Sequence, residues 1–317
     1  MRDEQEQRPD HKRSTKSEFD FIDALRQRAG TSGHSLVAGI GDDAAVVRST
    51  AGKETVITAD LLVEDIDFRR TTTPPYLLGH KAITVSLSDI AAMGARPLWS
   101  MVSIGVPEDV WETDFVERLY DGLLDLASRY GVQLIGGDTS RTNERIVIDS
   151  IVSGECGAGM AVMRSGASVG DQVFVTGSLG AAAAGLRLIE RGAHLAEQNL
   201  ADDDSQKLDH ILLRQLRPEP RVGWGIVLGD ERLATSMIDL SDGLSSDLNR
   251  LCTASNVGAL VDSALLPVDD RVTELCGRRA LGHFDPVGRI RYFADAFDLD
   301  AINSLREARN IAGLHRK

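Results

Sequence analysis

Five short segments of the chain place aspartate beside glycine, serine or threonine, and four of them directly follow an apolar run that is typical of a β-strand. Carboxylates repel one another and gain nothing from burial, so they rarely gather without a counter-charge. Magnesium bound to a polyphosphate supplies that charge and prefers oxygen ligands from several chain segments. The pattern therefore predicts a magnesium–nucleotide site built from dispersed aspartates. The segments are Gly39-Ile40-Gly41-Asp42-Asp43, Thr58-Ala59-Asp60, Ser86-Leu87-Ser88-Asp89, Gly136-Gly137-Asp138-Thr139 and Asp239-Leu240-Ser241-Asp242-Gly243.

Three of the segments present candidate metal ligands. Adjacent carboxylates on an extended chain point to opposite sides, so only one of the pair after Gly41 reaches a metal directly, and Asp43 is favoured. Asp60 ends a predicted strand that brings Thr58 to the same face, because strand side chains repeat every second residue. Asp89 falls inside a long apolar run, where an unpaired carboxylate is costly.

The remaining segments suit phosphate. Backbone amides at Gly137 and Asp138 follow a predicted strand and can cradle phosphate oxygens. Ser241 and Asp242 open a predicted helix, so they either serve the site or simply cap that helix. Arg164 precedes a glycine turn and is the cation best placed by sequence to touch phosphate, with an exposed arginine as the plain alternative. Several metal ions on one triphosphate would neutralise it and hold the γ-phosphoryl group in line with an acceptor.

Other catalytic templates are missing from the sequence. There is no Gly-x-x-x-x-Gly-Lys-Ser/Thr loop, no three-glycine dinucleotide fingerprint after Gly41, and no protein-kinase motif set. The three cysteines, Cys156, Cys252 and Cys276, are widely spaced and include no Cys-x-x-Cys pair. Neither a disulfide framework nor a zinc site is therefore predicted, and a reducing cytoplasm is the expected location.

Composition narrows the class of protein. The chain has 317 residues, of which 42% are hydrophobic and 26% charged, and it is long enough for two domains. A formal charge of -13 argues against nucleic acid or an anionic membrane as a partner, since both require a basic surface. No apolar run reaches the roughly 20 residues that span a bilayer. Residues 1–18 are polar and mixed in charge, which predicts a disordered leader.

The elements that must position these residues alternate between strands and helices. The pattern predicts an α/β or α+β protein with an N-terminal domain over 19–157 and a C-terminal α/β domain over 158–317. Strand-like runs occur at 44–47, 55–58, 61–68, 98–106, 132–135, 146–152, 172–176 and 234–238. Helical spacing occurs at 19–28, 76–93, 110–130, 181–191, 208–216, 221–228, 244–254 and 299–309.

The end of the chain differs from the rest. Residues 271–317 contain nine Lys and Arg against six Asp and Glu, a net charge of +3, so the remainder of the -13 chain carries -16. Hydrophobic periodicity in this tail is weak apart from the helix predicted at 299–309. The tail from about Arg271 is therefore atypical of the body that precedes it.

The aspartate segments, taken in order, resemble one enzyme family. The blocks 39–45, 86–95, 134–139, 164–167 and 238–244 are similar to thiamine-monophosphate kinase, a family within the aminoimidazole-ribonucleotide synthetase superfamily. The resemblance runs from about Asp20 to Leu266, and Ser-Leu-Ser-Asp-Ile-Ala-Ala-Met-Gly-Ala is its most specific block. It implies the two-domain fold of that superfamily, with an N-terminal mixed sheet that pairs with a second copy in a homodimer.

The resemblance also implies an activity and a set of contacts. The activity is ATP-dependent phosphorylation of thiamine monophosphate to thiamine diphosphate, by direct transfer with several Mg²⁺ ions. Metal binding is carried over to Asp43, Thr58, Ala59 (through its backbone), Asp60, Asp89, Asp138, Asp239 and Asp242. ATP contacts are carried over to Tyr120, Gly137, Asp138, Arg164 and Ser241, and the catalytic carboxylates are expected to be Asp89, Asp138 and Asp242.

Two features depart from the family pattern, both on the substrate side. The family has a histidine before the phenylalanine of segment 63–68, whereas this chain has Asp67, which still suits a hydrogen bond to the aminopyrimidine or a metal. The family's C-terminal Gly-Gly-Glu-Asp-Tyr-Glu motif and closing aromatic segment are missing, and the basic tail stands in their place. A diverged end and a shifted reading frame both explain this change.

Two alternative functions stay open. One is another ATP-using member of the superfamily. Selenophosphate synthesis favours a cysteine near the N-terminus and hydrogenase maturation favours one at the C-terminus, whereas the first cysteine here is Cys156 and the last residues are His315-Arg316-Lys317. The other is a protein that binds nucleotide or metal without turnover, which ATP affinity measured alongside turnover would distinguish from a kinase.

Overall fold

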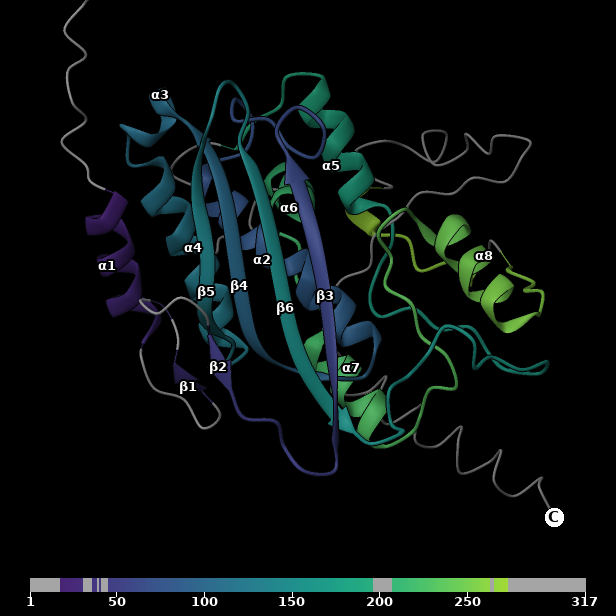
Figure 1. Cartoon of the computed structure of the whole chain (residues 1–317). Helices are drawn as coiled ribbons and strands as arrows, with labels where there is room; N and C mark the ends of the chain where they lie inside the picture. Colours follow the sequence, from purple (N-terminus) through teal and green to yellow (C-terminus); the bar gives the residue numbers. More distant parts are fainter. Residues whose placement is uncertain are drawn as a thin grey trace, which may run out of the picture.

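A four-stranded mixed sheet forms the centre of the molecule (Figure 1). The structure is a computed structural model that describes residues 18–30, 36–38, 40, 45–195, 207–262 and 265–272. The order is β3-β6-β4-β5, in which β6 pairs antiparallel with β3 and β4, whereas β4 and β5 run parallel. A separate two-stranded ladder joins β1 to β2. The strands are β1 (Leu36–Ala38), β2 (Val46–Val47), β3 (Lys53–Val63), β4 (Arg96–Pro107), β5 (Gln133–Thr142) and β6 (Val147–Gly157).

Helices cover one face of this sheet, and in the described part of the chain the other face is open (Figure 1). The helices α2 (Pro75–Ala92) and α4 (Phe115–Arg129) lie on the covered face, while α1 (Glu18–Ala29) and α3 (Glu108–Trp111) pack beside α4. The side chains of β3 alternate accordingly. Leu62 is buried, whereas Ile57 and Leu61 on the open face are 68% and 57% exposed.

The helix α2 is buried on nearly all sides. It contacts β3 and β6 of the sheet, and it also contacts the later helices α6 (Lys207–Leu216) and α7 (Val222–Asp230). Its apolar residues, such as Leu78, Ile83 and Leu87, are fully buried. A helix that packs on several sides has no polar stripe facing solvent, so its few polar side chains contact other protein groups or line a cavity.

The chain beyond β6 packs against α2 through helices. α5 (Ala181–Glu190) packs on α6, and α8 (Leu244–Ser255) follows α7. The helix α7 approaches α2 at backbone contact, since a Cβ at Gly225 would lie 2.2 Å from the carbonyl oxygen of Ala91. Three turns earlier on α2, His80 Nε2 donates a hydrogen bond to the carbonyl oxygen of Pro218 at 2.8 Å. No helix in the described residues is long and apolar enough to cross a membrane.

Comparison with the sequence shows which predicted elements form. The helices predicted within 19–254 are confirmed, with the one at 110–130 divided into α3 and α4. β3 joins the strand predicted at 55–58 to the start of the one predicted at 61–68 and ends at Val63, so the prediction for the rest of 61–68 is wrong, and residues 65–67 form a turn there. β5 is longer than predicted, and Asp60 and Asp138 therefore lie inside strands rather than after them. The strands predicted at 172–176 and 234–238 are wrong, because neither segment forms a ladder with another described segment. The predicted leader, up to residue 17, and the helix at 299–309 lie outside the described residues.

Candidate functional site

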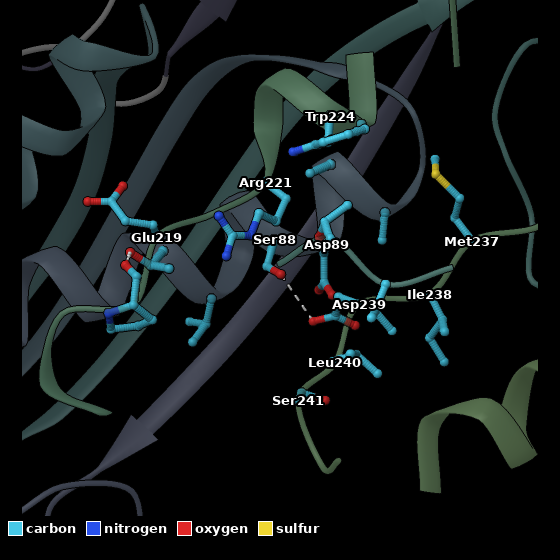
Figure 2. Close-up of a pocket in the computed structure, with 18 of the residues that line it drawn as sticks. Ser88, Asp89, Glu219, Arg221, Trp224, Met237, Ile238, Asp239, Leu240 and Ser241 are labelled. Atoms are coloured by element: carbon cyan, nitrogen blue, oxygen red, sulfur yellow. Dashed lines mark hydrogen bonds between the residues drawn. The ribbon is translucent and has the colours of Figure 1, made fainter. Parts of the chain in front are cut away.

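A pocket of about 460 Å³ lies where the sheet and α2 meet the C-terminal helices. One wall comes from β3 and α2, and the other comes from segments 173–176 and 236–241 together with α7 and α8. Figure 2 shows Ser88 and Asp89 of α2 lying next to Asp239 of the opposite wall. A concave site between two structural units is a common position for a ligand.

Three of the aspartates predicted to bind metal line this pocket, and each accepts a hydrogen bond from a hydroxyl group. Ser86 Oγ donates to Asp60 at 2.8 Å, and Ser88 Oγ donates to Asp239 at 3.3 Å. Asp89 accepts a 2.5 Å hydrogen bond from Thr58 Oγ1, and the metal role predicted for this threonine stays a prediction. The segments around residues 60, 89 and 239 therefore converge in space, as the sequence predicts.

Burial, together with nearby negative charge, raises the pKa values of Asp60 and Asp239. The pKa of Asp239 is about 6, because burial and the charges of Asp89 and Asp247 raise it more than Ser88 and Arg164 lower it. Burial also raises the pKa of Asp60, with smaller contributions from the charges of Asp89 and Asp149. A cation between the carboxylates would remove this repulsion.

The rest of the pocket is largely apolar. Its opposite wall includes Val173, Phe174, Trp224, Met237 and Leu244. Asp67, the predicted substrate contact, also lines the pocket, although its carboxylate accepts a 2.8 Å hydrogen bond from its own turn at Val63 N. Carboxylates from both walls beside these apolar side chains suit a ligand that combines metal-bound phosphates with an aromatic ring.

Asp247 holds the segment that carries Ser241 and Asp242, and the sequence reasoning missed it. Its carboxylate is fully buried, and Oδ2 accepts hydrogen bonds from the backbone amides of Ser241, Asp242 and Gly243 at 3.0, 3.1 and 3.0 Å. Oδ1 accepts a 2.8 Å bond from Arg250, which also pairs with Asp242. The available signal was the position of Asp247 in the first turn of a predicted helix, directly after the Asp242-Gly243 pair.

The other predicted contacts lie in three different environments. Ser241 lines the pocket, whereas Asp242 is exposed and paired with Arg250. Arg164 is exposed but close enough for its charge to lower the pKa of Asp239. Tyr120 is buried in the core, where its ring makes an edge contact with Phe21, so this structure does not place it at the pocket.

Asp138 lies on the open face of the sheet, away from the pocket-lining residues. It is exposed on β5, and its register partner on β4 is Ser103, which faces Asp149 of β6 on its other side. Gly137 precedes it on the same strand, and Ala59 of β3 is also exposed on this face. Asp43 lies outside the described residues. The contacts predicted for these four residues remain predictions.

The donor set fits magnesium held together with a phosphate ligand. Asp60, Asp89 and Asp239 offer the hard oxygen atoms that Mg²⁺ prefers. Yet in the described part of the chain no three His, Cys, Asp or Glu side chains are grouped closely enough to hold an ion by themselves. Magnesium commonly binds one or two carboxylates and completes its shell with water and substrate phosphates, and this arrangement suits that mode.

Comparisons with known proteins agree with this architecture. Residues 41–156 match the family model for the N-terminal domain of AIR synthase related proteins, and residues 168–281 match the model for their C-terminal domain. These two matches define the class: a two-domain protein of the AIR synthase type, with the pocket at the junction of the domains.

Individual relatives narrow the class further. The thiamine-monophosphate kinase of Bacillus subtilis (strain 168) is 39% identical over 259 residues, covering 81% of this chain and 77% of that protein. The crystal structure of thiamine-monophosphate kinase from Stenotrophomonas maltophilia K279a is 36% identical with a TM-score of 0.76, covering 93% of this chain and 91% of that one. The chain belongs to the thiamine-monophosphate kinase family.

One further solved structure was determined with ligands. It is described as AaThiL complexed with AMPPCP and TMP, and it is 30% identical with a TM-score of 0.66. The match covers 88% of this chain and 82% of that one.

Proposed function

We propose that the protein transfers the γ-phosphoryl group of ATP to the phosphate of thiamine monophosphate, which yields thiamine diphosphate and ADP. The observation that carries this proposal is the relationship to the B. subtilis kinase, at 39% identity over 81% of the chain. The pocket supports it, because its carboxylates suit a metal-bound polyphosphate and its apolar side chains suit an aromatic ring. The relative with AMPPCP and TMP supports the same pair of ligand classes.

We propose separate roles for these residues in binding the metal and in binding the nucleotide. Magnesium, when bound, would neutralise the phosphates and align the transferred group with its acceptor. Asp60, Asp89 and Asp239 would hold it, with the hydroxyls of Thr58 and Ser88 fixing two of these carboxylates in place. The further contacts proposed for the nucleotide and its ions are those of Asp43, Ala59, Tyr120, Gly137, Asp138, Arg164, Ser241 and Asp242.

We also propose that the protein is a homodimer that pairs through the open face of the sheet. Ile57 and Leu61 expose apolar surface on that face, and exposed apolar surface on a sheet commonly marks an interface. Cys156 and Cys252 are free and buried, which fits the reducing cytoplasm proposed as its location.

The test is a coupled measurement of binding and turnover. Purified full-length protein with ATP, Mg²⁺ and thiamine monophosphate should form thiamine diphosphate, detected by chromatography. ATP binding without product would reject the kinase activity and favour the alternative of a nucleotide-binding protein without turnover. That alternative has one observation in its favour, the loss of the family's substrate-side motif from the tail beyond Arg271.

A further inference from the structure

Lys81 is a cation on the pocket-facing side of α2. The residues of α2 that line the pocket recur at helical spacing, from Lys81 through Val85 and Ser88 to Asp89 and Ala92. Lys81 and Asp89 therefore share one face of the helix and lie about 12 Å apart along its axis, since eight residues rise 1.5 Å each. The pocket thus has carboxylates at one end of α2 and an ammonium group two turns away.

The ammonium group of Lys81 is short of partners. Its Nζ donates a hydrogen bond to the backbone carbonyl of Asp67 at 3.3 Å, and within the described residues it forms no ion pair. Burial lowers the pKa of Lys81, and the charge of Asp67 only partly opposes this effect. Lys81 is half-buried, and a lysine withdrawn from water usually has an anionic partner, so an anionic ligand in the pocket would complete its surroundings.

Two other cations line the same pocket, and neither belongs to α2. Arg214 of α6 donates a 3.2 Å hydrogen bond to His210 of the same helix. Arg221 lies between Glu219 and Ser88 (Figure 2). Lys81 is the pocket cation that shares a helix face with Asp89 and touches the turn of Asp67, the predicted substrate contact.

We propose that the ammonium group of Lys81 binds the phosphate of the acceptor substrate, a phosphate monoester, while the aspartates hold the metal-bound phosphates of the nucleotide. This inference rests on the proposed function. Two anionic phosphates must approach each other for transfer, and a fixed positive charge at the acceptor offsets their repulsion. A lysine suits this task because its ammonium is a compact point charge with three donors.

The experiment removes the charge of Lys81 from the protein and, separately, the phosphate from the ligand, and compares the effects on affinity. Full-length wild type and the variant Lys81→Met are titrated with thiamine monophosphate and with thiamine by calorimetry, in the presence of Mg²⁺ and AMPPCP. We expect the Kd of thiamine monophosphate to rise about tenfold or more in the variant, because one charge-assisted contact is lost. The Kd of thiamine, which has no phosphate, should stay within about twofold, and Lys81→Arg should retain most of the affinity.

Steady-state kinetics supply the second readout. Lys81→Met should raise the KM of thiamine monophosphate and leave the KM of ATP unchanged, whereas Lys53→Met, which removes an exposed lysine of β3, should change neither. An unchanged Kd for thiamine monophosphate, or an equal loss of affinity for both ligands, overturns the proposal. Absence of turnover in the wild type rejects the proposed function instead, and the titrations still decide the role of Lys81. Lys81→Gln replaces Lys81→Met if the latter does not fold.

Discussion

At the scale of single residues, the pocket gathers carboxylates that disfavour one another. The charge of Asp89 raises the pKa values of both Asp60 and Asp239, so each negative charge makes the next one harder to form. Such an arrangement is costly in the protein alone and becomes favourable when a cation is shared. The electrostatic cost of placing these carboxylates together therefore indicates that they bind a cation and do not stabilise the fold.

The variant Asp89→Asn tests the effect of this carboxylate on catalysis separately from its effect on stability. We expect kcat to fall by about 100-fold or more, because one charge is lost from the proposed metal bridge. The thermal midpoint without magnesium should stay equal or rise, since repulsion on Asp60 and Asp239 is relieved. Turnover assays and thermal unfolding measure the two quantities.

The matched control is Asp114→Asn, the same change at an exposed helix N-cap whose side chain makes no capping bond. It should alter neither quantity. Retention of full kcat in Asp89→Asn would refute the metal role proposed for this residue.

Sequence reasoning at this scale identified residues with one chemical signature. The aspartates at 60, 89 and 239 stand out because carboxylates beside apolar runs are unusual, and the structure brings them together. Asp247 and Lys81 resemble ordinary charged residues of helices, and only tertiary packing shows that both are turned inward. Tyr120 is the opposite case: its motif position predicts an ATP contact, whereas the structure shows its side chain buried in the core.

At the scale of elements, the segment before α8 depends on one buried carboxylate. Asp247→Asn keeps the shape, but whichever oxygen its NH2 group replaces, that group faces a donor, either the Arg250 guanidinium or the three backbone amides, and the negative charge is lost. We expect a loss of about 2–3 kcal/mol of unfolding free energy, typical of a broken buried charged hydrogen bond. The KM of ATP should rise as well, because Ser241 loses its fixed position.

Denaturant unfolding and initial-rate kinetics measure these two effects. Ser246→Ala, an exposed change one residue before Asp247, is the control and should be neutral. A destabilised variant with unchanged KM for ATP would show that the segment has a structural role only.

The contact between α2 and the segment before α7 makes stability depend on pH. Burial lowers the pKa of His80 from its ordinary value of 6.5, and the neutral ring donates to Pro218. Below about pH 6.5 the unfolded chain takes up a proton that folded His80 resists, so stability is complete above this pH and falls as pH drops toward the lowered pKa. The slope from this group is at most about 1.4 kcal/mol per pH unit.

The difference between wild type and His80→Gln isolates this contribution, since glutamine keeps a donor for Pro218 but does not titrate. Unfolding free energies measured from pH 7.5 to 5 should show a shallower decline in the variant. Parallel curves would mean that other groups produce the pH dependence.

Element lengths were harder to predict than element types. Glycine-rich stretches such as 136–137 weaken strand patterns in sequence, yet pairing with β4 extends β5 through them. The reverse holds at 172–176, where a strand-like composition forms no ladder with another described segment. Local composition therefore predicts which segments can form strands, whereas pairing with a neighbouring strand decides whether a strand forms and where it ends.

At the scale of the whole molecule, the open sheet face predicts self-association. Leu61→Glu places a charge on that face, on its edge strand β3, so we expect the proposed dimer to become a monomer by light scattering after gel filtration. Leu186→Glu alters an exposed leucine on α5 and should leave the mass unchanged. A wild-type monomer, or a Leu61→Glu dimer, would reject this interface.

The two-domain class and the order of the site segments followed from the sequence, whereas the separation of Asp138 from the pocket did not. The face on which a strand residue lies depends on register, and a bulge in the β4–β5 pairing shifts that register just before Asp138. Motif position alone carries no such information.

The backbone contact between α2 and α7 also bears on ligand design. Where Gly225 meets Ala91, no side chain can rotate aside to admit extra atoms, so the main chain sets the width of the pocket there. An inhibitor would have to gain size along the wall of Phe174 and Leu240 instead. Bulky groups aimed between the two helices would be rejected whatever their chemistry.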